Sequence, residues 1–182
     1  GDMSTNDTVL ILANGLAGNG KLGATDLKIF QSALNHVCLE LAKMIVCDGE
    51  GITRVVTVRV KGAKTFADAD AAARAVGNSA LVKTSWNGGD PNWGRIMAAA
   101  GRAGVDFNLH RAALWIGASK GEPLQLLRCG APCDYQESDA AQIFARSDFN
   151  VRLDLGCGRA ETTVWTGDLT HKYVSINTDY RT

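Results

Sequence analysis

A ten-residue segment at positions 87–96, NGGDPNWGRI, constrains the fold of this chain more than any other. Two glycines and an Asp-Pro step precede a Trp and a run of small and apolar residues that ends near Gly101. Asp90 is suited to accept hydrogen bonds from the first free N–H groups of a helix, and Pro91 suits the first helical position because it needs no partner there. The segment therefore predicts a sharp entry from a loop into a helix that extends to about residue 101.

The composition limits the classes of protein to which the chain can belong. It has 182 residues, of which 46% are hydrophobic, with 19 basic and 19 acidic side chains. Such a chain can bury a core, and a net charge near zero gives no sign of nonspecific binding to nucleic acid or anionic membranes. No apolar run approaches the roughly 20 residues of a membrane span, and we expect no signal peptide. The five cysteines show no zinc-like spacing, so we expect free buried thiols, no metal and a cytoplasmic location.

The hydrophobic pattern predicts several helices. Apolar residues at helical spacing indicate a long amphipathic helix over residues 25–46. Thr65, with Asp68 three residues later, forms the pattern of a capping box, and Gly77 is placed to end the helix that it starts. A further helix is expected over residues 139–146.

Strands are expected where apolar and β-branched residues run together or alternate. These ranges are 8–13, 52–60, 80–85, 111–117, 124–128, 150–155 and 161–166. The Gly156-Cys157-Gly158 turn is expected to join the last two strands as a hairpin. Near Gly104, Ala-rich helices give way to strand-rich sequence, so the chain is expected to divide into parts 1–103 and 104–182.

The loop from Gly18 to Gly23 fits the pattern G-x-G-x-x-G and nearly fits a P-loop. It lies between an expected strand and an expected helix, as a nucleotide site requires. However, Leu22 stands where magnesium coordination needs Ser or Thr, and no acidic strand end follows at the spacing that ribose recognition needs. A flexible connecting loop is the favoured interpretation, and a nucleotide-binding module is the alternative.

The turn Asp48-Gly49-Glu50-Gly51 places two carboxylates at the C-terminus of the expected long helix. The helix dipole disfavours negative charge there, so a cationic ligand or a basic side chain is needed to compensate. The flanking glycines allow a ligand to approach the backbone closely. From the residues alone, an exposed turn is favoured over a binding site.

Several segments together resemble the arginine-pathway ornithine acetyltransferases, also called glutamate N-acetyltransferases. They are GDMSTNDT at 1–8, LANG at 12–15, DGEG at 48–51, residues 78–84, DPNWGRI at 90–96 and the ending YRT at 180–182. The resemblance spans nearly the whole chain in the family's order. It implies an α/β fold of layered helices and mixed sheets of the DmpA-like type, of which this chain would be the C-terminal α+β part.

The resemblance also implies an activity and a subunit organisation. Members of this family cleave themselves before a Thr, and the freed Thr of the β chain carries the acetyl group from N-acetylornithine to glutamate in a ping-pong reaction. Some members also use acetyl-CoA as a donor, but no bound cofactor is implied. The matched residues would form most of a β chain, whose partner would be the α chain of the same precursor in an (αβ)2 heterotetramer. A paralogue in secondary metabolism would share the same motifs.

The family's functional residues map onto three positions of this chain. Its cleavage Thr lies upstream of the motif that begins at Gly1, so no catalytic residue is expected here and the 182 residues alone are expected to be inactive. Glu50 matches the Glu of the family's DGEG turn, whose carboxylate would hold the cationic amine of the substrate. Asn177 and Thr182 match tail residues that would close the pocket around the amino-acid end of the substrate.

Overall fold

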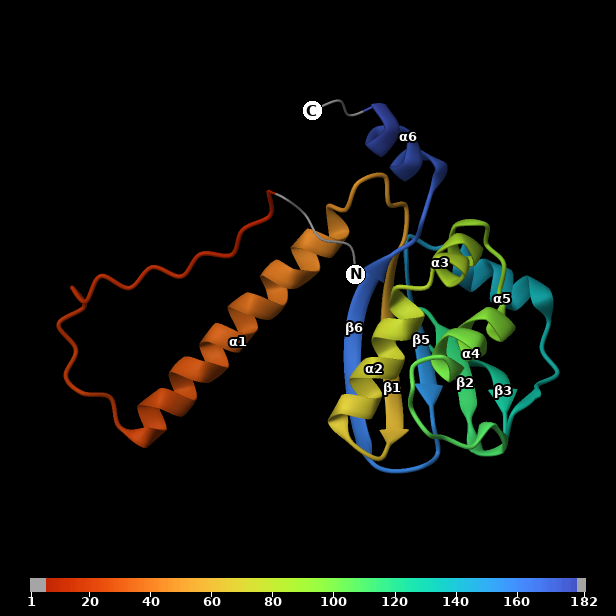
Figure 1. Cartoon of the computed structure of the whole chain (residues 1–182), viewed down its shortest axis with the longest axis horizontal. Coiled ribbons are helices and arrows are strands. Elements are labelled where there is room, and N and C mark those ends of the chain that lie inside the picture. The colour runs from red at the N-terminus through yellow and green to blue at the C-terminus, as the bar shows by residue number, and fades with distance from the viewer. Residues whose placement is uncertain (1–5, 180–182) are drawn as a thin grey trace. The chain divides into compact units, whose positions relative to one another are not determined.

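The computed structural model describes residues 6–179 of the chain (Figure 1). Its contacts divide the chain into two compact units, Gly1–Ile45 and Val46–Thr182. The division expected at 103/104 stays a prediction, although strands from both sides of it pair in one sheet of the second unit.

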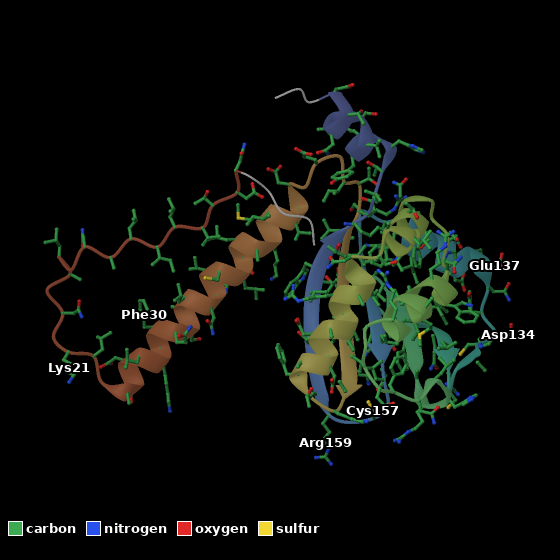
Figure 2. The ribbon with its side chains drawn as sticks, viewed as in Figure 1. Lys21, Phe30, Asp134, Glu137, Cys157 and Arg159 are labelled. Carbon is green, nitrogen blue, oxygen red and sulfur yellow. The ribbon has the colours of Figure 1, made fainter. Side chains whose placement is uncertain are left out.

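The first unit consists of an irregular segment and most of helix α1 (Ala24–Cys47), which confirms the helix predicted over residues 25–46. The strand predicted over residues 8–13 is wrong. These residues form no strand, and Leu12 is 91% exposed. A strand needs a neighbour to accept and donate its backbone hydrogen bonds, and the described part of the chain gives this segment none. Most large apolar side chains of α1, including Phe30, are also exposed (Figure 2).

The second unit is built on one six-stranded sheet with the order β4-β3-β2-β5-β1-β6. The strands are β1 (Val55–Ala63), β2 (Ala113–Gly117), β3 (Leu124–Arg128), β4 (Ala131–Pro132), β5 (Asp148–Asp154) and β6 (Ala160–Gly167). β1 runs parallel to β5, and the remaining pairs are antiparallel. The predicted class, helices layered on a mixed sheet, is confirmed.

The predicted hairpin of the last two strands is wrong, because β1 lies between β5 and β6 and pairs with both. The connection crosses the end of β1 instead of turning back on itself. Leu155 N–H donates to the carbonyl of Lys61 (2.9 Å), and Cys157 N–H donates to that of Gly62 (2.8 Å). β1, which carries valines on its buried face, therefore lies where the Gly-Cys-Gly turn indicated that β5 and β6 would pair directly.

The helices of the second unit are α2 (Phe66–Gly77), α3 (Ala80–Asn87), α4 (Trp93–Gly101), α5 (Glu137–Phe144) and α6 (His171–Asp179), with a short 3-10 helix at Leu109–Arg111. α2 begins with the predicted capping box, in which Thr65 and Asp68 bond each other's backbone N–H groups. Residues 80–85 were predicted as a strand, which is wrong. Ser79 caps a helix there, and Val82 and Trp86 are buried at helical spacing on one face.

Helix α4 follows the loop of the NGGDPNWGRI segment as predicted, but its cap is different. Asn92, not Asp90, accepts the hydrogen bond from the N–H of Arg95 (3.1 Å), and Pro91 lies before the cap rather than in the first turn. Asp90 instead accepts a hydrogen bond from the Asn92 side-chain amide (3.1 Å). The carboxylate therefore orients the capping residue and does not cap the helix itself.

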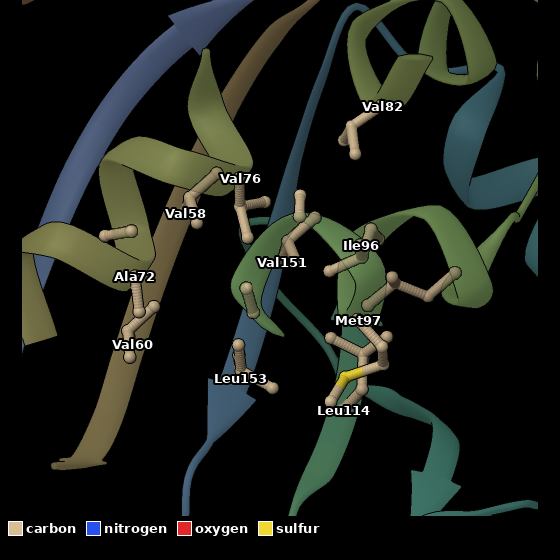
Figure 3. Packing of buried hydrophobic residues seen from close by; sticks show 14 of the residues in the cluster. Val58, Val60, Ala72, Val76, Val82, Ile96, Met97, Leu114, Val151 and Leu153 are labelled. Atoms are coloured by element: carbon tan, nitrogen blue, oxygen red, sulfur yellow. The ribbon is translucent and has the colours of Figure 1, made fainter. Parts of the chain in front are cut away.

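The core lies between the sheet and the helices that cover one of its faces. Val58 and Val60 of β1 pack against Ala72 and Val76 of α2, and Figure 3 shows these side chains together with those of β5 and α4. Alternate residues of β1 are fully buried, which follows from the two-residue period of a strand covered on one face. Removing this much apolar surface from water is the main source of stability for the second unit.

The five cysteines are free, as predicted, but they are not buried. Cys38, Cys47 and Cys129 are exposed, and Cys133 and Cys157 are half-buried. Cys157 lies in the loop after β5 (Figure 2) and directs its Sγ to the carbonyl of Gly62 at 3.1 Å. The apolar helix face on which burial of Cys38 was predicted is itself uncovered in the described unit.

Candidate functional site

Two of the three predicted substrate contacts lie together in the second unit. Glu50 is exposed in the turn that connects α1 to β1, and Asn177 is exposed on α6. The Nδ2 group of Asn177 donates to Oε2 of Glu50 at 2.8 Å and to the carbonyl of Tyr173 at 2.9 Å. This contact joins two side chains that lie 127 positions apart in the sequence. Thr182, the third predicted contact, lies outside the described residues.

The turn that carries Glu50 lies directly against the first turn of α6. Gly51 has a φ of +68°, and a Cβ added to it would lie 2.7 Å from the backbone nitrogen of Tyr173. A left-handed backbone and such a close approach together require glycine at this position. The DGEG pattern therefore has a structural reason beside the chemistry of its carboxylates.

Thr170 connects the same two segments through its hydroxyl group. Its Oγ1 donates to the carbonyl of Gly51 at 2.7 Å and accepts from the N–H of Tyr173 at 3.2 Å. The residue is 8% exposed and immediately precedes α6, so it occupies the N-cap position of that helix.

Asp168 is the buried carboxylate beneath this turn, and the sequence analysis missed it. The residue is 2% exposed and follows the end of β6. Its Oδ1 accepts from the backbone N–H groups of Thr53 (2.7 Å) and Arg54 (3.0 Å). Its Oδ2 accepts from the hydroxyl of Thr53 (2.6 Å) and the amide of Asn87 (2.9 Å). The carboxylate thus joins the start of β1, the end of β6 and the end of α3.

Two opposing effects act on the pKa of Asp168. Burial favours the neutral acid and raises the pKa, whereas the hydrogen bonds from Thr53, Asn87 and Arg54 stabilise the carboxylate. The hydrogen bonds outweigh burial, so the pKa of Asp168 lies below its usual value. The guanidinium of Arg54, 3.6 Å away, adds a positive charge beside the group. Asp168 is therefore held as an anion.

Arg54 connects this cluster to the ends of α5 and α3. Its Nε donates to the carbonyl of Phe144 at the end of α5 (2.7 Å), and its Nη1 donates to that of Asn87 at the end of α3 (3.0 Å). Both carbonyls belong to the last turn of a helix, where they have no partner within the helix and attract positive charge. The loop before β1 is consequently fixed from several sides.

The NGGDPNWGRI segment borders a separate cavity of about 550 Å³, which residues 89–94 line together with Tyr135, Glu137 and Ala141. Burial raises the pKa of the Tyr135 hydroxyl, and the nearby carboxylate of Glu137 adds to this effect. Neither Glu50 nor Asn177 lines the cavity. The segment contributes to the Asp168 cluster only through Asn87, at the end of α3.

The Gly18–Gly23 loop does not have the setting of a nucleotide site. Within residues 6–179 no strand precedes it, and all six of its residues are exposed. The nucleotide-binding alternative is not supported, because the phosphate-binding loop of such sites is anchored between a strand and a helix of a parallel sheet. No described helix is long and apolar enough to cross a membrane.

A comparison with solved structures defines the class of this α/β chain. The crystal structure of arginine biosynthesis bifunctional protein argJ from Bacillus halodurans is similar to it with a TM-score of 0.88 and 37% sequence identity, over 99% of this chain and 84% of that one. The ArgJ family model matches residues 1–182. The chain therefore belongs to the ArgJ family.

Curated relatives agree with this assignment. The chain is 47% identical to the arginine biosynthesis bifunctional protein ArgJ of Symbiobacterium thermophilum and 45% identical to the glutamate N-acetyltransferase of Methanopyrus kandleri, each over 184 residues. A mitochondrial ArgJ of Schizosaccharomyces pombe is 44% identical. Each match covers 100% of this chain but only 41–46% of the relative. The chain spans less than half the length of these relatives.

Proposed function

We propose that the protein to which these residues belong transfers an acetyl group from N-acetylornithine to glutamate in arginine biosynthesis. The names of the relatives, which include a glutamate N-acetyltransferase, support this activity. The word bifunctional in several of those names supports acetyl-CoA as a second acetyl donor. The near-neutral charge and the free cysteines support a cytoplasmic location.

The single observation that carries the proposal is the contact between Glu50 and Asn177. The exposed carboxylate of Glu50 accepts a hydrogen bond from the neutral amide of Asn177, and it would bind an ammonium group more strongly than this amide, because charge-assisted hydrogen bonds are the stronger kind. N-acetylornithine carries such a group on its side chain. Glu50 would hold this ammonium group, while Asn177 and Thr182 would close the pocket around the amino-acid end of the substrate.

The acetyl group would travel on a threonine that lies upstream of these 182 residues. The hydroxyl of that Thr attacks the acetyl carbonyl, the bond to the α-nitrogen breaks, and ornithine leaves with the proton. The amine of glutamate then attacks the acetyl ester and restores the hydroxyl. The residues of this chain would bind and orient the substrate.

The α chain of the same precursor would be the partner in an (αβ)2 assembly. The support comes from the first unit, where Val9, Leu10, Ile11 and Leu12 are 71–91% exposed. Four consecutive apolar side chains in water are unfavourable, and patches of this kind mark interaction sites. The α chain would cover this segment and supply the oxyanion hole.

The role of Glu50 is tested by steady-state kinetics on the full-length protein. Glu50→Gln removes the charge and keeps the shape, so KM for N-acetylornithine should rise by one to two orders of magnitude, which corresponds to about 1.5–3 kcal/mol for a hydrogen bond to a charged group. The matched control is Glu122→Gln, which changes an exposed glutamate beside another glycine and should leave KM unchanged. Equal KM values for both variants would remove Glu50 from the binding site.

The acetyl intermediate is tested by mass spectrometry of the full-length protein after brief incubation with N-acetylornithine. We expect two chains, with one acetyl group on the N-terminal Thr of the chain that contains Gly1 and Asp2. A single uncleaved and unmodified chain would contradict the proposed activity, whatever the outcome for Glu50.

A further inference from the structure

The contacts around α6 form a closed ring that includes both proposed substrate contacts. Glu50 is bonded to Asn177, and Asn177 is bonded to the carbonyl of Tyr173, whose N–H is bonded to Thr170. The Thr170 hydroxyl is bonded in turn to the carbonyl of Gly51, the neighbour of Glu50. Thr170 is therefore the buried side chain of the ring that joins the Glu50 turn to the first turn of α6.

The described side chains of α6 are exposed or half-buried. The helix has no buried residue, so it gains little from apolar packing. Glu50 and Asn177 are both exposed, and a single hydrogen bond between exposed side chains contributes little by itself. The buried hydroxyl of Thr170 is better placed to fix the helix, because a buried bond is protected from competition by water.

Asp168 provides a rigid base for Thr170. It lies two residues earlier and holds both Thr53 and Arg54, which are three and four residues from Glu50. The segment that carries Thr170 and the segment that carries Glu50 are thus fixed to each other beneath the site. The bond from Thr170 to Gly51 extends this connection to the exposed pair.

We propose that Thr170 is a positioning residue that sets the distance between Glu50 and Asn177 and thereby the affinity for the substrate. It does not touch the substrate, and it acts by placing α6 against the DGEG turn. This inference rests on the proposed function, because it assigns Thr170 a role in the binding site of which Glu50 is part.

The chain offers a closely matched control for Thr170. Thr166 is also 8% exposed and also donates from its hydroxyl to a glycine carbonyl, that of Gly77 at 2.9 Å. Replacing either residue by valine removes one buried hydrogen bond to a glycine carbonyl, and Thr170→Val also removes the N-cap bond from the N–H of Tyr173. Of the two hydroxyl groups, only that of Thr170 bonds the Glu50 turn. A KM that rises in Thr170→Val but not in Thr166→Val therefore reports the position of α6 and not a general loss of stability.

The experiment measures KM and kcat for N-acetylornithine with the full-length protein. Thr170→Val should raise KM about threefold to tenfold through the loss of the Thr170 hydrogen bonds, and leave kcat within about twofold. Thr170→Ser keeps the hydroxyl and should restore the original KM. Thr166→Val should also lose thermal stability but keep its KM. If Thr170→Val does not fold, Thr170→Ala replaces it.

A double-mutant cycle with Asn177→Ala completes the test. If Thr170 acts through α6, its effect on KM should largely disappear once Asn177 is removed, since coupled residues are not additive. A Thr170→Val variant whose KM matches that of Thr166→Val would overturn the positioning role, and so would additive effects. Glu50→Gln separates the two proposals. If it leaves KM unchanged, the proposed binding site fails; if it raises KM while Thr170→Val does not, only the positioning role fails.

Discussion

The residues around Glu50 differ in how well their roles can be recognised from sequence. Glu50 and Asn177 are found because their segments resemble a known family, and the structure brings them to 2.8 Å. Asp168 and Thr170 have no such signal, and most of their hydrogen-bond partners lie 81–119 positions away. An Asp between a strand and a helix is common in loops, and only the tertiary structure shows that this one is buried.

The charge of Asp168 should make stability depend on pH. Its pKa is lowered in the folded state, so its contribution is present above the unfolded value of about 4 and is lost as the pH falls through the folded value. Asp168→Asn should lower the free energy of unfolding by about 2–4 kcal/mol at pH 7. The substitution replaces one carboxylate oxygen by an amide NH2 group, which cannot accept the hydrogen bonds that the surrounding donors make. In urea titrations, the difference from the unmodified protein should shrink below pH 4.

A surface carboxylate serves as the control for this prediction. Asp106 also has a lowered pKa, because of its hydrogen bond to Lys64, but its side chain is 92% exposed. Asp106→Asn should change stability little at any pH, since an exposed ion pair is screened by solvent. If the two variants behaved alike, the hydrogen bonds to Asp168 would not contribute to stability in the way their geometry indicates.

At the scale of elements, the sequence predicts those whose signal is local. The capping box of α2 and the helical spacing of apolar residues in α1 are patterns among residues close together in the sequence, and both predictions are confirmed. Residues 80–87 are ambiguous because a short apolar run fits either a strand or a helix, and burial against the sheet decides for α3. The position of β1 between β5 and β6 is a pairing over long range, which no local pattern encodes.

Helix α6 should be dispensable for folding but not for activity. Deleting residues 177–182 removes Asn177 and the end of the chain, while all residues that make up the core of the second unit remain. The full-length protein without these six residues should keep its melting temperature within a few degrees and lose most of its acetyl transfer. Circular dichroism melting and steady-state kinetics measure both. Full activity after the deletion would show that the tail does not close the site.

The two units differ sharply in how much apolar surface they bury. The second unit encloses a cluster of fully buried side chains, whereas the described part of the first unit contains no buried residue. The first unit therefore lacks the burial that offsets the entropy of ordering a chain. The relatives are more than twice as long as this chain, which leaves ample polypeptide to supply the missing contacts.

Covering of the first unit by the rest of the protein can be tested at Leu12. Leu12→Asn should weaken the association of the proposed α and β chains in the full-length protein. Burial of the leucine side chain would contribute about 1.5–3 kcal/mol to the free energy of association, and the substitution places a polar amide there instead. Leu81→Asn, at a 64% exposed leucine of α3, is the matched change and should leave association intact. Native mass spectrometry measures the ratio of intact to dissociated complex.

Hydrogen exchange tests the same covering without a mutation. The backbone amides of residues 8–13 should be protected from exchange in the full-length protein if they find hydrogen-bond partners there. Rapid exchange of this segment, together with equal association of both variants, would mean that the α chain binds elsewhere and that these leucines remain in water.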